Sequence, residues 1–275
     1  MIVASGNASL RLNHFYVVLD SATYRAIEEN DIMRRNFAPN ELRTTVRTDE
    51  TYTGLYFYGR TTYFEVFDVE KSPRPHLGAW GLAFGVDDPG GISKFAAGAG
   101  PMLDPKPELI TRLYSGSQVP WFYMATLPDF AMHSSNAIWI MEYHPEFLSR
   151  WNPRPGEGAG QITRQDILRR YAEVVAPVQQ PMLADVVSIT ISVDTRVGVR
   201  LAEFARRVGA SVTTASGSTE IHTPDCAIRL LTEKTPRGFL EVGMSAARES
   251  EPATISLGRA SLQVGGGSIA LTFGD

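Results

Sequence analysis

This sequence of 275 residues contains few cysteine and histidine side chains that could bind a metal or act as a catalyst. There is one cysteine, Cys226, and there are five histidines: His14, His76, His133, His144 and His222. A single cysteine can form neither an intrachain disulfide nor a cysteine zinc site. Because Cys226 precedes an apolar, strand-like segment, we interpret it as a small buried residue and not as a nucleophile. Any metal site must therefore draw largely on carboxylates.

Aromatic side chains gather in two spans of the sequence. The spans contain Tyr52, Tyr56, Phe57, Tyr58, Tyr63, Phe64 and Phe67, and then Trp121, Phe122, Tyr123 and Trp139. Strand alternation would direct about half of them into a cavity suited to a flat organic ligand, and the rest into ordinary sheet packing. Arg43 and Arg47 share a strand face and could meet a carboxylate or phosphate, although such arginines are more often solvated or paired with acids.

Composition excludes several classes of protein. Lys and Arg number 26 against 30 Asp and Glu, a formal charge of −4, whereas a nucleic-acid-binding protein needs a basic face. No apolar run approaches the ~18 residues of a membrane helix. Residues 1–10 lack the basic stretch and apolar core of a signal peptide. We therefore expect a cytoplasmic protein with neither a nucleic-acid nor a membrane partner.

Several catalytic motifs are absent or incomplete. Gly156, Gly158 and Gly160 alternate but follow prolines instead of a strand, so they do not form a dinucleotide-binding loop. The glycines at 265–267 have no phosphate-loop lysine and are typical of a hairpin turn. No Gly-x-Ser-x-Gly motif is present, which disfavours a serine hydrolase of that type.

Three segments share one pattern: an apolar stretch, an aspartate and then a helical periodicity. They run through residues 12–20, 80–87 and 186–194. The apolar stretches are short and rich in β-branched or aromatic residues, as in strands, and the aspartate suits a helix N-cap. Further strand-like segments follow each helix, so the recurring unit is strand–helix–strand–strand–strand. Such a unit is too small to bury its sheet face alone, and we expect units to pair.

A Pro/Gly-rich stretch at residues 152–160 marks the best domain boundary. A helix capped by Thr163 should follow, from about residue 164 to 176. We therefore predict a first module pair over 1–150, a linker and helix over 151–182, and a second, degenerate module pair over 183–275. The predicted class is α+β, with tandem βαβββ modules that pair into curled mixed-sheet cups.

This order of elements resembles the vicinal oxygen chelate superfamily, which includes glyoxalase I, extradiol dioxygenases and bleomycin-resistance proteins. The likeness covers residues 12–145 well and 185–275 more loosely, and it points to a little-characterised glyoxalase-like subgroup whose first strand is similar to Leu12-Asn-His14. It implies metal ligands on the first and last strands of each module. The matching positions are His14, Glu65 and Glu142, whereas the fourth position holds Gly81 or Leu82.

The resemblance implies a divalent metal, either Zn, Mn, Fe, Co or Ni, on His14, Glu65 and Glu142, with open positions for substrate oxygens. Glu142 or His144 would move protons, although Pro145 makes a strand that continues past His144 improbable. His133 lies in a polar loop beside this strand. The expected ligand-lining side chains are Tyr16, Arg47, Tyr56, Tyr63, Phe67, Trp121, Tyr123 and Trp139.

The second half of the chain is poorer in chemistry. Ser188 stands where the first half has His14, and Glu241 could align with Glu65. We prefer to place Glu241 on the first strand of a shortened fourth module, which leaves this half without a ligand set. Its expected role is to support the first cup, to close over it or to form a homodimer.

Two functions remain open. The favoured one is a metal-dependent lyase, isomerase or dioxygenase that acts on a small oxygen-bearing, aromatic or polyketide-like metabolite of secondary metabolism. The alternative is a metal-free protein that binds and sequesters a small molecule, as bleomycin-resistance relatives do. The matched His14, Glu65 and Glu142 set favours the enzyme, and the low content of other catalytic residues favours the binding protein.

Overall fold

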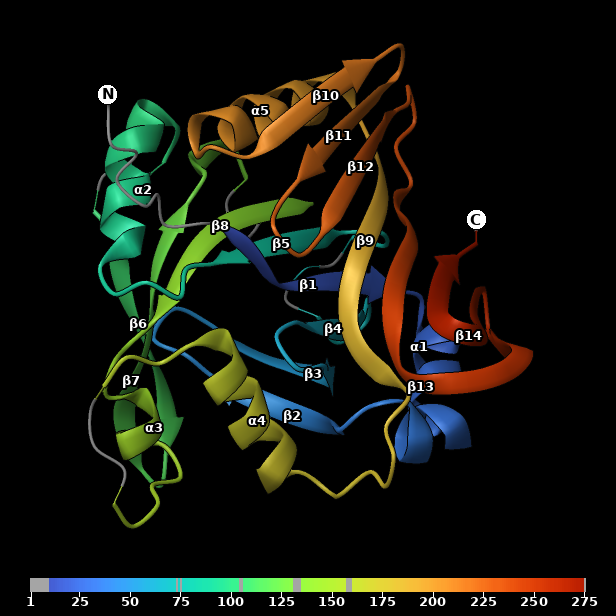
Figure 1. Ribbon diagram of the computed structural model, residues 1–275, viewed down its shortest axis with the longest axis horizontal. Helices are drawn as coiled ribbons and strands as arrows, with labels where there is room; N and C mark the ends of the chain where they lie inside the picture. Colours follow the sequence, from blue (N-terminus) through green and yellow to red (C-terminus); the bar gives the residue numbers. More distant parts are fainter. Residues whose placement is uncertain are drawn as a thin grey trace.

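Two β-sheets and five α-helices make up the part of the chain that the structure describes (Figure 1). The computed structural model describes residues 10–72, 74, 76–103, 106–130, 135–156 and 160–274. The predicted His133 therefore lies outside the described residues. Within the described ranges, no helix is long and apolar enough to cross a membrane.

The first module forms one half of the larger sheet, sheet A. Its elements are β1 (Arg11–Leu19), α1 (Ser21–Glu29), a π-helical turn (Met33–Phe37), β2 (Asn40–Val46), β3 (Thr51–Tyr58) and β4 (Tyr63–Asp68). Asp20 caps α1, because its carboxylate accepts the backbone N–H groups of Ala22 and Thr23. Strand β4 pairs in parallel with β1, and β3 and β2 follow in antiparallel order.

The second module repeats this arrangement and completes sheet A. Its elements are β5 (Trp80–Gly85), α2 (Gly91–Ala99), a 3₁₀ turn (Gly100–Met102), β6 (Glu108–Tyr114), β7 (Ser117–Thr126), a second 3₁₀ turn (Pro128–Phe130) and β8 (Asn136–Tyr143). The modules join through antiparallel β1 and β5, which gives the strand order β2-β3-β4-β1-β5-β8-β7-β6. The two edges then meet, because Arg47 forms a β-bridge with Arg112 and the hydroxyls of Thr48 and Thr111 lie 2.8 Å apart. We call this curled, nearly closed sheet the barrel.

The rest of the chain adds two helices and then sheet B. The elements are α3 (Phe147–Arg150), α4 (Arg164–Val174), β9 (Leu183–Val193), α5 (Thr195–Arg207), β10 (Ser211–Ala215), β11 (Ser218–His222), β12 (Ala227–Thr232), β13 (Gly238–Leu257) and β14 (Ala260–Phe273). Sheet B has the order β10-β11-β12-β9-β13-β14. Strand β13 pairs antiparallel with β9, as β5 does with β1. The α+β class with tandem βαβββ modules and a curled mixed sheet is thus confirmed.

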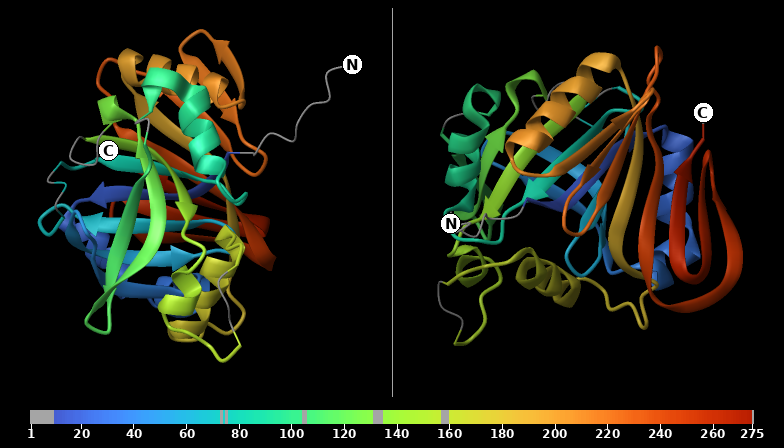
Figure 2. Two further views of the ribbon diagram at one scale, coloured as in Figure 1. Left: turned by 90° about the vertical axis from the view of Figure 1, so that its left-hand side faces the viewer. Right: turned by 45° about the horizontal axis from the view of Figure 1, so that its top comes forward.

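The buried side chains form two separate cores on the two faces of sheet A. The outer core lies between the barrel and sheet B with α1, α2 and α5, and it includes the ring pair Phe15–Phe239, whose centroids are 4.8 Å apart. The inner core lies inside the barrel and includes Tyr16, Tyr56 and Trp139. Sheet B therefore covers the outside of the barrel (Figure 2).

Helix α4 closes onto the inner core. Thr163 and Asp166 form a capping box that fixes its first turn. Ile167, Leu168 and Tyr171 then face the interior of the barrel, and the Tyr171 ring lies 5.2 Å from that of Tyr58. The helix crosses the sheet in front of β2 and β3 in Figure 1. The predicted helix after the Pro/Gly-rich stretch thus packs against the inner core of the barrel.

Candidate functional site in the barrel

The interior of the barrel combines aromatic rings with buried charged groups. His14 comes from β1 and Glu65 from β4, on strands that pair in parallel, and each residue is only 5% exposed. Alternation along both strands turns these side chains inward, while Phe15, Phe64 and Val66 face the outer core. The structure therefore brings His14 and Glu65 together, as the first-module alignment predicted.

His14 and Glu65 form a close pair with a defined orientation. Nε2 of His14 lies 3.6 Å from Oε1 of Glu65, and Nδ1 lies 2.8 Å from Oδ1 of Asn13. Because the carbonyl oxygen of Asn13 only accepts, we assign the imidazole hydrogen to Nδ1, which turns the Nε2 lone pair toward Glu65. The imidazole is held between rings: it stacks on Tyr63 at 4.3 Å and meets the edge of Trp139 at 5.2 Å.

Burial moves the pKa values of this pair in opposite directions. Burial raises the pKa of Glu65 to about 7, against the attraction of Arg43, Arg74 and Arg47. Burial also lowers the pKa of His14 well below 6.5, and the same arginines lower it further. Near neutral pH the pair therefore combines a neutral imidazole with a carboxyl group that is close to its titration point.

Two of the arginines around the pair, Arg43 and Arg47, are held by acids. Nη1 of Arg43 donates to Oε1 of Glu41 at 2.8 Å, and the guanidinium lies 3.9 Å from the centre of the Tyr56 ring. Arg47 donates from Nε and Nη2 to the two carboxylate oxygens of Asp49. These contacts fix guanidinium groups inside a low-dielectric interior, where each acts strongly on its neighbours.

Arg74 and Arg112 reach the interior from outside the region that the sequence pattern singled out. Nη2 of Arg74 donates to Oε1 of Glu50 at 2.9 Å, and its guanidinium lies 4.6 Å from the centre of the Tyr16 ring. Arg112 stacks near Trp121, 4.9 Å from the ring centre. Neither residue was predicted from the sequence, because Arg74 follows the last strand of its module and Arg112 belongs to the distant edge strand β6. The buried aromatic residues would have been the only signal.

Most of the predicted ligand-lining side chains do lie in the barrel. The inner core contains Tyr16, Tyr56, Tyr63, Phe67, Trp121 and Trp139. Arg47 faces the same interior, 5.6 Å from the centre of the Phe122 ring. Tyr123 is the exception, because it packs against the outer core and its ring lies 5.5 Å from that of His144.

Glu142 lies on the other face of sheet A, so the prediction that it completes a metal site with His14 and Glu65 is wrong. Its two carboxylate oxygens accept the backbone N–H groups of Gly90 and Ile92, at 2.7 and 2.9 Å, at the start of α2. Along β8, Trp139, Met141 and Tyr143 face the inner core, whereas Ile138 and Ile140 face the outer core. Glu142 alternates with Met141 and Tyr143, so it faces the same side as Ile138 and Ile140.

His144 is also separate from the interior. It follows the end of β8 with the same outward parity as Glu142, and its Nδ1 accepts the backbone N–H of Glu146 at 3.1 Å. It lines a surface hollow with Tyr114 and Arg150. The structure therefore does not bring the two predicted proton-moving residues, Glu142 and His144, to the His14–Glu65 pair.

At the position where the resemblance implies a fourth metal ligand, the Tyr16 ring packs over Gly81. Gly81 on β5 stands opposite Tyr16 on β1, and a Cβ atom at Gly81 would lie 2.2 Å from the Tyr16 ring. The glycine is therefore needed so that the Tyr16 ring can lie across β5.

The barrel contains buried polar atoms that have no hydrogen-bond partner among the described residues. The nitrogen atoms are Nε and Nη1 of Arg74, Nε of Arg112 and Nε1 of Trp121 and Trp139. The oxygen atoms are Oε2 of Glu50 and the hydroxyl of Tyr16. Each unpaired buried donor costs about 1–3 kcal/mol. The surplus is thus one of N–H donors.

The residues present do not fit a divalent metal. His14 and Glu65 supply two donor atoms, but no group of three metal-ligating side chains is found in the part of the chain that the structure describes. The tyrosines beside the pair stay protonated, because burial raises the pKa of Tyr56 and Tyr63 well above 10. Arg43, Arg47 and Arg74 also surround the pair, and their guanidinium groups repel a cation. The nearby carboxylate of Glu50 is already paired with Arg74 and Arg47.

Comparisons with known proteins agree with this architecture. A family model described as "Family of unknown function (DUF5829)" matches residues 12–272. No curated protein matches the chain.

Three similar solved structures illustrate the range of likeness. A hypothetical protein from Staphylococcus aureus has a TM-score of 0.52 at 10% identity, over 90% of this chain and 95% of that one. BphC, a halotolerant catechol dioxygenase, has a TM-score of 0.39 at 10% identity, over 87% and 69%. An extradiol ring-cleaving dioxygenase from B. fuscum has a TM-score of 0.36 at 11% identity, over 84% and 57%. The first of these supports the fold alone.

Proposed function

The chain belongs to the DUF5829 family of unknown function, and we propose that its barrel binds a small anionic molecule that carries an aromatic ring, without a metal. The observation that carries this proposal is the surplus of buried N–H donors in the barrel. Arg74, Arg112, Trp121 and Trp139 each have a side-chain nitrogen that finds no hydrogen-bond partner among the described residues. A ligand rich in acceptor oxygens, such as a carboxylate or a phosphate ester, would satisfy them.

The aromatic residues specify the rest of the ligand. Tyr16, Tyr63 and Trp139 surround the His14–Glu65 pair with ring faces and edges. Rings in such a cage favour a flat, polarizable body. The buried guanidinium groups favour a negative charge on that body, because an arginine binds an anion most strongly where water is excluded.

The ligand would enter past α4. The lining side chains are almost fully buried, so the closed barrel gives solvent no direct path to His14. Helix α4 covers the interior with side chains from outside sheet A, as do Phe147 and Trp151 at α3. It is held to the barrel in part by Tyr171, whose hydroxyl accepts Nη1 of Arg112 at 3.3 Å.

The geometry favours binding over catalysis, and one observation supports a second candidate. The neutral imidazole of His14 can accept a proton while the carboxyl of Glu65 gives one, which is the arrangement that a proton-transferring isomerase or lyase needs. Recovery of the bound molecule separates the two candidates: an unchanged molecule supports a binding protein, and conversion supports the enzyme.

Binding can be tested by thermal unfolding of the full chain with phenyl phosphate, benzoate and the neutral analogue benzamide, each with and without EDTA. We expect the anions to raise Tm and benzamide to do so less, with no effect of EDTA. Trp139→Phe removes an unpaired N–H while keeping a ring and should weaken anion binding about tenfold. Trp151→Phe is the matched control, since its N–H is not among the unpaired groups.

The proposal fails if none of the anions shifts Tm, if benzamide binds as tightly as benzoate, or if Trp139→Phe and Trp151→Phe behave alike. Loss of binding in EDTA that added Zn²⁺ or Mn²⁺ restores would also overturn it and would return the metal-dependent function to favour.

A further inference from the structure

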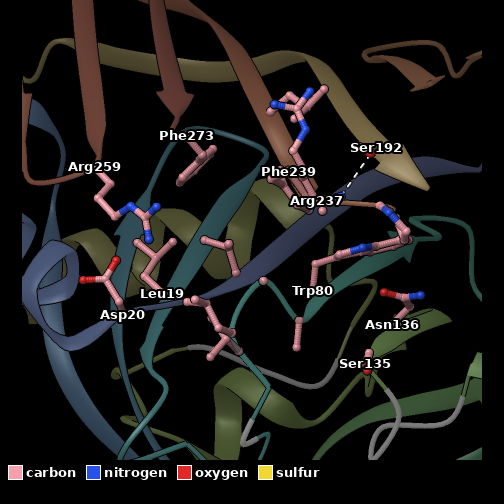
Figure 3. Close-up of a pocket in the computed structure, with 18 of the residues that line it drawn as sticks. Leu19, Asp20, Trp80, Ser135, Asn136, Ser192, Arg237, Phe239, Arg259 and Phe273 are labelled. Carbon is pink, nitrogen blue, oxygen red and sulfur yellow. Dashed lines mark hydrogen bonds between the residues drawn. The ribbon is translucent and has the colours of Figure 1, made fainter. Parts of the chain in front are cut away.

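A large cavity lies outside the barrel, where the strand ends of sheet A meet those of sheet B (Figure 3). Its volume is about 830 Å³, which is within the ~300–1,000 Å³ of ligand pockets. Its walls come from the end of β1, the start of β5 and β8, the end of β9, the start of β13 and the ends of β14. We call it the junction cavity.

The floor of the junction cavity is apolar and aromatic. Trp80, Phe239 and Phe273 line it, with the rings of Trp80 and Phe239 6.2 Å apart and edge to face. At its rim, Leu77 is 58% exposed, whereas most large apolar side chains of the described residues are buried. Leu77 thus adds an exposed apolar side chain beside the aromatic floor.

Most charged groups at the rim already have partners. The carboxylates of Asp20 and Asp194 accept backbone N–H groups at the starts of α1 and α5. Arg237 donates to both carboxylate oxygens of Glu233, and its backbone N–H donates to Ser192, as the dashed line in Figure 3 shows.

The Arg259 guanidinium makes no hydrogen bond and no close ion pair among the described residues, although it lies near enough to the Asp20 carboxylate to attract it (Figure 3). Only its backbone is fixed: its N–H donates to the hydroxyl of Thr23, and its carbonyl accepts the N–H of Gly274. The side chain is exposed and extends beside Phe273, on the same side of the cavity as Asp20 (Figure 3). Its planar guanidinium is always charged and can donate hydrogen bonds to an anion that lies above the aromatic floor.

We propose that the junction cavity is a second ligand site, which takes an amphipathic anion: a ring system or other apolar body against Trp80, Phe239 and Phe273, with a carboxylate or sulfonate on Arg259. The site is independent of the barrel. Trp80 and Phe239 belong to the outer core, and the barrel's unpaired donors lie on the opposite face of sheet A.

A matched pair of fluorescent probes tests this proposal on the full chain. 8-Anilinonaphthalene-1-sulfonate carries the expected apolar body and anionic head, whereas N-phenyl-1-naphthylamine has the same body without the charge. We expect one sulfonate molecule to bind per chain. Its Kd should be about tenfold lower than that of the amine, because a hydrogen bond to a charged group changes affinity by about tenfold. Arg259→Gln should abolish this preference and leave the affinity for the amine unchanged.

Two control variants locate the site. Arg229→Gln removes an exposed arginine of β12 that does not line the cavity, and Trp139→Phe alters the barrel; both should keep the preference for the sulfonate. The proposal is overturned if binding does not saturate at one probe per chain, if Arg259→Gln retains the preference, or if Trp139→Phe abolishes sulfonate binding, which would place the probe in the barrel.

Discussion

Sheet A and sheet B contain the same module, but the face that carries His14 and Glu65 is buried in sheet A, whereas the matching face of sheet B is open to solvent at Arg229. The order β2-β3-β4-β1 of the first module reappears as β10-β11-β12-β9, with the last strand parallel to the first in both. In the barrel, Tyr16 pairs with Glu65 two residues after His14. In sheet B the corresponding residues are Thr190 and Arg229, two residues after Ser188.

The enclosure decides what chemistry these positions can have. The second module closes the barrel over His14 and Glu65, so that both are buried. The β13–β14 hairpin pairs with β9 along one edge only, and the matching face of sheet B leaves Arg229 exposed. Burial raises the pKa of a carboxyl group to about 7 in the barrel, at Glu65, whereas the matching position of sheet B holds the exposed Arg229. The following three predictions test this contrast, from the largest expected effect to the smallest.

Glu50→Gln should destabilise the protein by about 3–5 kcal/mol, because it leaves the buried guanidinium groups of Arg74 and Arg47 without their shared carboxylate. Glu220→Gln is the counterpart in sheet B, where the exposed ion pair with Arg229 is worth about 1 kcal/mol at most. Urea unfolding monitored by circular dichroism measures both. Equal losses would contradict the difference in enclosure.

Glu65→Gln should stabilise the ligand-free protein at high pH. Since the pKa of Glu65 rises from 4.5 to about 7 on folding, the folded state holds its proton more tightly than the unfolded chain. The wild type then loses stability as pH rises from 4.5 through about 7, and the glutamine variant does not share this loss. The variant's advantage should grow to the order of 3 kcal/mol above pH 8.

This second prediction is checked by the free energy of unfolding from pH 5 to pH 9. Glu241→Gln, at an exposed position of β13, is the control. A constant difference between Glu65→Gln and the wild type over this range would show that Glu65 is not buried as a titrating group.

Gly81→Ala should cost about 1–3 kcal/mol, because its methyl group would overlap the Tyr16 ring inside the packed barrel. Gly267→Ala in β14 meets no atom within 4 Å and should change stability by less than about 0.5 kcal/mol. The difference in Tm between the two variants measures the packing contrast directly. A well-tolerated Gly81→Ala would mean that Tyr16 can leave its place across β5.

The fold could be predicted from the sequence because its signals are local. Each apolar stretch followed by an aspartate became a strand and then a helix, and Asp20 and Asp194 cap their helices as predicted. Asp87 does not cap α2, because its carboxylate accepts from Arg164 instead. The pairing of modules followed from the apolar area that a single module cannot bury.

The candidate site could be predicted only in part because it depends on register. His14 and Glu65 lie on neighbouring parallel strands and were predicted correctly to lie together. Glu142 was predicted by matching β8 to β4, and an error of one residue in such a match places a side chain on the opposite face of the sheet. Arg74 and Arg112 reach the interior from a connection after β4 and from the far edge strand, and nothing near them in the sequence indicates that approach. Long-range closure of the barrel creates their environment.

The shared outer core has a consequence for how this chain could evolve. Phe15 and Phe84 of the barrel pack against Phe239 and Phe204 of the C-terminal half, with centroids 4.8 and 6.1 Å apart. A gene carrying only the first half would encode a barrel with an uncovered apolar wall, prone to self-association. Recombination could therefore exchange the C-terminal half only for a sequence that covers the same apolar wall.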